Sequence, residues 1–86
     1  MKGKTETGFS FNIDPDVLDD WETVKILRKI DKGETAMIVD AIERILGEEL
    51  ETKLETFIQK RDGKVSASAM TKEFVEILNS IKDGKN

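Results

Sequence analysis

Apolar side chains recur at every third or fourth position along most of this chain, and this spacing is the strongest constraint on its fold. Four stretches carry the pattern, within residues 15–31, 35–46, 48–62 and 66–82. Glycines separate them, at Gly33, Gly47 and Gly63. Such spacing places apolar side chains on one face of an α-helix. We therefore predict a mainly α fold, with three to four short helices in a compact bundle.

The ends of these helices carry recognisable signals. Asp14 is suited to cap the first helix, Pro15 to its first turn and Asp16 to the positive end of its dipole. We expect this helix to run to about Asp31. Its predicted apolar face consists of Val17, Leu18, Trp21, Val24, Leu27 and Ile30. Gly47 is expected to end or bend the next helix. The turn Asp62-Gly63 should close the third, and Ser66 or Ser68 should cap the last.

The N-terminal segment has a different period. Phe9, Phe11 and Ile13 alternate with polar residues, which is typical of a half-buried strand. Residues 4–7 are expected to pair back across Gly8 as a short hairpin. An isolated two-stranded hairpin is marginal in water, so this arm should pack on the helices or on another chain. The predicted organisation is a single domain with an arm (1–13), a helical body (14–82) and a frayed tail (83–86).

Composition removes several classes of function. The 86 residues include no Cys and no His, so zinc fingers, disulfide scaffolds, and Cys or His catalysis are excluded. The net charge of -4 disfavours nucleic-acid binding, which calls for surplus Lys and Arg. A helix-turn-helix over residues 34–49 would offer a single basic side chain, Arg44. We predict no enzyme activity, no cofactor and no nucleic-acid partner.

The segment around Asp62-Gly63 superficially resembles a calcium loop. With Gly63 at the sixth loop position, positions 1, 3 and 12 fall on Ile58, Lys60 and Ala69. A calcium loop needs oxygen ligands at all three positions. We therefore interpret the segment as a turn between helices and predict no metal site.

Acidic residues gather just after the arm, at Asp14, Asp16, Asp19, Asp20 and Glu22. A first helical turn rich in acids is simply good helix design, so a solvated face is the favoured interpretation. The alternative is a patch that faces a basic partner, because the first half of the chain carries the whole net negative charge.

Three aromatic residues, Phe9, Phe11 and Trp21, are the second candidate contact feature. They can project to a partner, since Trp is enriched at interface hot spots, or fill the small core, which we favour. The candidate partner-binding residues are therefore Phe9, Phe11, Asp16, Asp19, Asp20 and Trp21.

We expect the chain to carry no targeting signal. No apolar run reaches the roughly 18 residues that cross a bilayer, and the first residues are polar. We expect no membrane partner and an intracellular location. Small domains often gain stability by association, so a homo-oligomer is also an expectation.

The segments 8–14 and 17–22 resemble the start of small proteins encoded in tail modules of long-tailed phages and prophages of Gram-positive bacteria. Later landmarks agree, namely residues 45–49, 62–65 and 69–70. The resemblance implies a tail assembly chaperone in the host bacterial cytoplasm. Such a protein binds the tape-measure protein, helps recruit tail-tube subunits and is absent from the finished virion. The alternative, from the acidic residues, is a small regulatory or inhibitory protein that docks on a basic protein.

Overall fold

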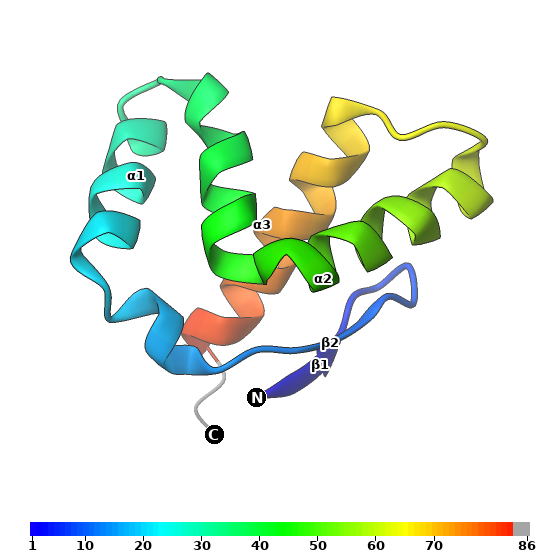
Figure 1. Cartoon of the computed structure of the whole chain (residues 1–86), viewed down its shortest axis with the longest axis horizontal. Helices are drawn as coiled ribbons and strands as arrows, with labels where there is room; N and C mark the ends of the chain where they lie inside the picture. The colour runs from blue at the N-terminus through cyan, green and yellow to red at the C-terminus, as the bar shows by residue number, and fades with distance from the viewer. Residues whose placement is uncertain (84–86) are drawn as a thin grey trace.

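The computed structural model describes residues 1–83. Within them the chain forms two short strands, β1 (Lys2–Lys4) and β2 (Ser10–Asn12), and the α-helices α1 (Trp21–Asp31), α2 (Ile38–Asp62) and α3 (Ala67–Asp83). Two 3-10 turns precede α1 and α2, at Pro15–Leu18 and Thr35–Met37. The predicted mainly helical fold with an N-terminal hairpin is confirmed. The hairpin lies beneath the second half of α2, while α3 crosses behind α2 (Figure 1).

The hairpin differs in register from the prediction. Its pairs are Lys2 with Asn12, Gly3 with Phe11 and Lys4 with Ser10. The Thr5 N–H continues the ladder by donating to the Phe9 carbonyl at 2.9 Å, so residues 6–8 form the turn. The Gly8 N–H donates to the Thr5 carbonyl at 3.0 Å, and the φ of Gly8 is 103°. A three-residue loop that ends in a left-handed glycine is a common hairpin turn. This turn selects the observed register.

The predicted first helix is wrong in extent, because the chain breaks it at residues 19–20. Asp14 caps only the 3-10 turn, and Asp20 then caps α1 by accepting the Thr23 N–H at 3.1 Å. The restart rotates α1, so that Thr23 is buried while Trp21 and Val24 are exposed. These two residues therefore leave the predicted apolar face.

The remaining boundaries follow the glycines and one serine. Gly47 interrupts the helical geometry of α2, with a φ of 79° and a ψ of 162°, so α2 consists of two helical segments that meet at a kink there, as the sequence predicted. Gly63 ends α2 in the left-handed conformation, as predicted. The Ser66 hydroxyl accepts the Ala69 N–H at 3.1 Å and so caps α3. Asp83 belongs to α3, contrary to the predicted tail, and residues 84–86 lie outside the described residues.

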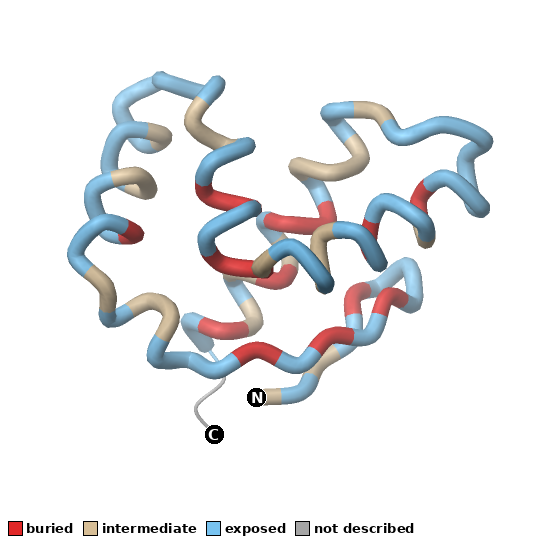
Figure 2. The backbone as a smooth tube through the Cα atoms, in the orientation of Figure 1, coloured by how far each residue is buried: buried red, intermediate tan, exposed pale blue. Residues whose placement is uncertain are grey.

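The core lies between the hairpin, α2 and α3, as the buried segments in Figure 2 show. It contains Phe9, Phe11, Ile13, Ala41, Ile42, Ile45, Leu46, Leu54, Ile58, Phe74, Ile77 and Ile81. Helix α1 contributes only half-buried apolar residues, including Ile26, Leu27 and Ile30. It is thus attached to one side of the body and is not part of its centre. No helix within residues 1–83 has the length and apolar character needed to cross a membrane.

Candidate functional site

The acidic segment before α1 is partly consumed by local structure. The Asp14 carboxylate accepts the Asp16 N–H at 2.9 Å and caps the 3-10 turn. Asp16 and Asp19 are exposed, while Asp20 is half-buried at the start of α1. The five predicted acids therefore do not act as one patch, because two of them serve as helix caps.

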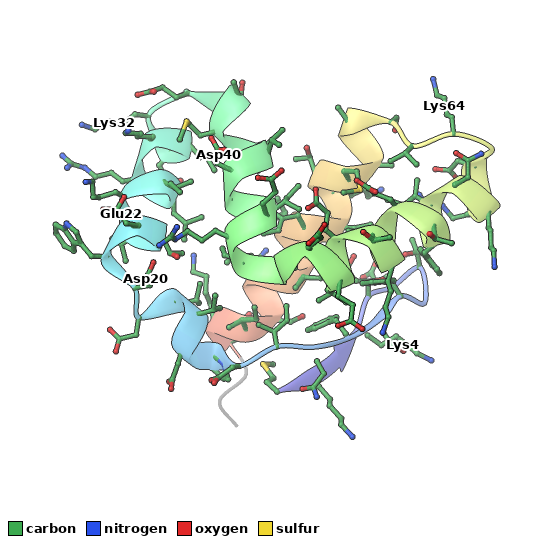
Figure 3. The ribbon with its side chains drawn as sticks, viewed as in Figure 1. Lys4, Asp20, Glu22, Lys32, Asp40 and Lys64 are labelled. Atoms are coloured by element: carbon green, nitrogen blue, oxygen red, sulfur yellow. The ribbon has the colours of Figure 1, made fainter. Side chains whose placement is uncertain are left out.

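Asp20 joins α1 to α2. Its Oδ2 accepts the Thr23 hydroxyl at 2.9 Å and the Arg44 Nε–H, also at 2.9 Å. Arg44 Nε lies 3.2 Å from the Thr23 hydroxyl as well. The hydrogen bond from Arg44, supported by those from Thr23, lowers the pKa of the Asp20 carboxyl. Figure 3 shows Asp20 where the chain enters α1. We assign Asp20 a structural role, since its carboxylate is already occupied.

The aromatic trio divides into two groups. Phe9 and Phe11 are only 5% and 4% exposed, so both belong to the core. The Phe9 ring lies 5.4 Å from the Phe57 ring, centroid to centroid, in a tilted arrangement. Neither phenylalanine is available to a partner in this conformation. The core interpretation thus applies to these two residues and not to Trp21.

Trp21 is the most exposed large apolar side chain among the described residues, at 73%. Val24, one helical turn further along α1, is 44% exposed. Residues three apart lie on the same helix face, so the two side chains form a small apolar surface. This apolar surface lies on α1, a helix in which Thr23 is the single buried residue. Of the six predicted contact residues, Trp21, Asp16 and Asp19 are the ones left exposed.

A second acidic surface, which was not predicted from the sequence, lies on α2. Glu43, Glu48, Glu51 and Glu55 line a hollow of about 460 Å³ at the Gly47 bend, together with Thr52. Partial burial, and then the charges of Glu43, Glu55 and Glu48, raise the pKa of the Glu51 carboxyl. The signal was available, because residues 48, 51 and 55 share a helix face. Glu43 lies across the Gly47 bend from the other three.

One carboxylate is fully enclosed. Glu73 on α3 is 2% exposed, and its Oε2 accepts the Thr7 hydroxyl at 2.6 Å. Arg61 Nη1 donates to the same oxygen at 3.3 Å, while Oε1 has no partner among the described residues. Arg61 also binds both carboxylate oxygens of Asp62, which raises the Arg61 pKa and lowers that of Asp62. The cluster fixes the hairpin turn to the helices. It offers a ligand no open access.

The described residues contain no group of three or more acidic side chains placed to hold a metal ion. Comparisons of the chain with protein-family models, curated proteins and solved structures found no significant match. No relative therefore constrains the function, and the surface features have to indicate it.

Proposed function

We propose that the chain is a non-enzymatic phage or prophage tail assembly chaperone. It would act in the host bacterial cytoplasm, bind the tape-measure protein, help recruit tail-tube subunits and be left out of the mature virion. Two things support the proposal. One is the resemblance of residues 8–14 and 17–22 to small proteins of phage tail modules. The other is a contact surface that suits protein binding without chemistry.

The observation that carries the proposal is the exposure of Trp21. A tryptophan that is 73% exposed leaves a large apolar surface in water, and burying it against a partner is favourable. Trp is also among the residues that most often dominate binding energy at interfaces. Its neighbour Val24 extends the surface along α1. We infer that the outer face of α1 contacts the long helical partner.

The test is co-purification from the native host during phage induction. The chain carries a C-terminal tag, and the captured proteins are identified by mass spectrometry. We expect the wild type to recover a very long helical protein or a tail-tube subunit. Trp21→Ala should lose it, whereas Val75→Ala, at a 43% exposed position of α3, should retain it. Both side chains are exposed, so neither change should unfold the chain.

Two results would count against this proposal in different ways. Recovery of tail proteins by both variants would mean that another surface makes the contact. Recovery of no tail protein by the wild type would reject the assembly function itself.

The acidic hollow on α2 favours a second candidate, a small regulatory or inhibitory protein that docks on a basic protein. Glu43, Glu48, Glu51 and Glu55 concentrate negative charge in a recess, which suits a basic side chain of a partner. This function predicts a one-to-one complex that weakens with salt. Changing Glu48, Glu51 and Glu55 together to Gln should abolish it and leave a Trp21-dependent complex intact.

A further inference from the structure

The outer edge of β2 has unpaired backbone groups. The Thr5 N–H donates to the Phe9 carbonyl at 2.9 Å, and the Ile13 N–H donates to the Met1 carbonyl at 2.8 Å. Hydrogen-bonded pairs alternate along an antiparallel ladder, so the N–H and C=O of Ser10 and Asn12 point away from β1. Within residues 1–83 these groups have no partner outside the hairpin. An edge of this kind is a template for another strand.

A groove accompanies this edge. It has a volume of about 570 Å³ and lies between the hairpin and the second half of α2. Phe11, Leu46 and Leu50 supply its apolar lining, and Leu50 is only half-buried. Side chains of an added strand would alternate between two faces. Those on the Phe11 side would enter this groove, and those on the other side would face solvent beside Ser10 and Asn12.

The charged side chains that line the groove are mostly positive, although the chain as a whole is acidic. Lys2 and Lys53 line the groove, and Lys4 projects from the hairpin into open space (Figure 3). The one acid of the lining, Glu49, lies 3.8 Å from the Lys53 ammonium. A second copy that paired through the same edge would present the same two groove lysines. Charge complementarity therefore favours an acidic partner over a second copy.

We propose that the outer edge of β2 binds an extended, acidic segment of a partner protein as a third strand. Alternate apolar side chains of that segment occupy the groove at Leu46 and Leu50. Its acidic side chains lie next to Ser10 and Asn12, on the sheet face that also carries Lys2 and Lys4. The hairpin ladder extends from Phe9 to Ile13, which offers length for a segment of about six residues. This site is separate from the Trp21 surface, and it does not depend on the tail assembly function.

The test uses the full chain and a capped hexapeptide that alternates Glu and Val. The peptide is titrated into isotope-labelled protein, and binding is followed by NMR shifts and by amide hydrogen exchange. We expect the Ser10 and Asn12 amides to exchange at least about tenfold more slowly in the complex, because each gains a hydrogen bond. A peptide with Lys in place of Glu should bind at least about tenfold more weakly.

Two controls isolate the backbone contact. The same peptide, N-methylated at alternate residues, cannot pair as a strand and should bind about tenfold more weakly. Asn12→Pro removes the outward N–H, which makes no hydrogen bond to β1, and should also weaken peptide binding. Asn12→Ala keeps this N–H and should bind the peptide like the wild type. The methylated peptide needs no variant protein, so the test holds even if Asn12→Pro fails to fold.

Several outcomes would overturn the proposal. They are the absence of binding at millimolar peptide, shifts confined to α1, or equal binding of the methylated peptide. Protection of Ser10 and Asn12 that grows with protein concentration in the absence of peptide would also do so, because it would assign the edge to a second copy.

Discussion

The Thr7 hydroxyl donates a 2.6 Å hydrogen bond to Glu73 Oε2, and so joins the tip of the hairpin to α3 across 66 positions of sequence. The Glu6 N–H reinforces this link by donating to Glu76 on the same helix. A buried carboxylate that loses a hydrogen-bond donor keeps its desolvation cost with one compensating hydrogen bond fewer. The Thr7–Glu73 contact therefore anchors the hairpin on the helices.

Thr7→Val removes this hydroxyl and keeps the side chain's shape. We expect it to lower the free energy of unfolding by about 1–3 kcal/mol, measured by urea denaturation. Thr56→Val, at an exposed position on α2, is the control and should have little effect. Glu73→Gln combined with Thr7→Val completes a double-mutant cycle. Strictly additive effects of the two changes would show that the contact contributes nothing.

Gly3→Ala tests the packing inside the hairpin. A Cβ added at Gly3 would lie 2.4 Å from Cζ of Phe11, a residue of the core. The ring would have to shift, and overpacking of this kind costs about 1–3 kcal/mol. We expect a lower urea midpoint at an unchanged slope, while Lys4→Ala on the outer face should match the wild type. A Gly3→Ala protein as stable as the wild type would contradict the close approach of ring and backbone.

Asp20→Asn tests the pairing of Asp20 with Arg44. Arg44 and Thr23 lower the pKa of Asp20 in the folded state. The folded state is therefore stabilised at pH values above the pKa of Asp20 in the unfolded chain, near 3.8, and this stabilisation is lost as the pH falls through the lower pKa of the folded state. Asn still caps a helix but carries no charge. We expect a lower Tm than wild type at pH 7 and a difference that shrinks below about pH 4. Asp19→Asn, at the exposed neighbouring position, should melt like wild type at both pH values.

Asp20 also shows why the sequence located the helices better than their ends. The strong start signal at Asp14 and Pro15 is real, but it produces one 3-10 turn, and Asp20 then starts α1 again. The sequence alone does not show whether Asp14 or Asp20, six residues later, caps the long helix, because that depends on which face of the helix packs on the rest of the protein. Because the restart turns the helix, the apolar spacing that includes Trp21 and Val24 did not identify the buried face.

The spacing of apolar residues predicted core positions on α2 and α3, whereas no comparable pattern predicted the buried Glu73 or the open edge of β2. Periodic residues such as Leu54, Ile58 and Ile77 are buried because the helices they belong to pack on each other. Glu73 had no such signal, since its charge indicates exposure and its partner Thr7 comes from a distant turn. The edge of β2 depends on the register of the hairpin, and the polar residues 1–7 carry no alternation that would specify it.

Gly47→Ala tests the bend in α2. The φ of 79° and ψ of 162° at Gly47 fall in a region that is essentially restricted to glycine, although a Cβ there would meet no atom within 4 Å. We expect a loss of about 1–3 kcal/mol of unfolding free energy, because a straight helix would pull Leu54 and Ile58 out of the core. Gly63→Ala, in the ordinary left-handed region, should cost less. A more helical and more stable Gly47→Ala protein would show that the bend is not required.

Glu51→Gln tests the repulsion in the acidic hollow. Burial and the neighbouring acids raise the pKa of Glu51 above 4.5, so its charged form disfavours the folded state, and this penalty is present above the folded-state pKa. We expect the variant to have a higher Tm than wild type at pH 7 and low salt. The difference should decrease as pH falls and Glu51 becomes protonated, and also as salt screens the charges. Glu49→Gln, which removes the partner of Lys53, should give no such increase. A Glu51→Gln protein that melts below wild type at pH 7 would mean that the charge of Glu51 is balanced in the folded chain.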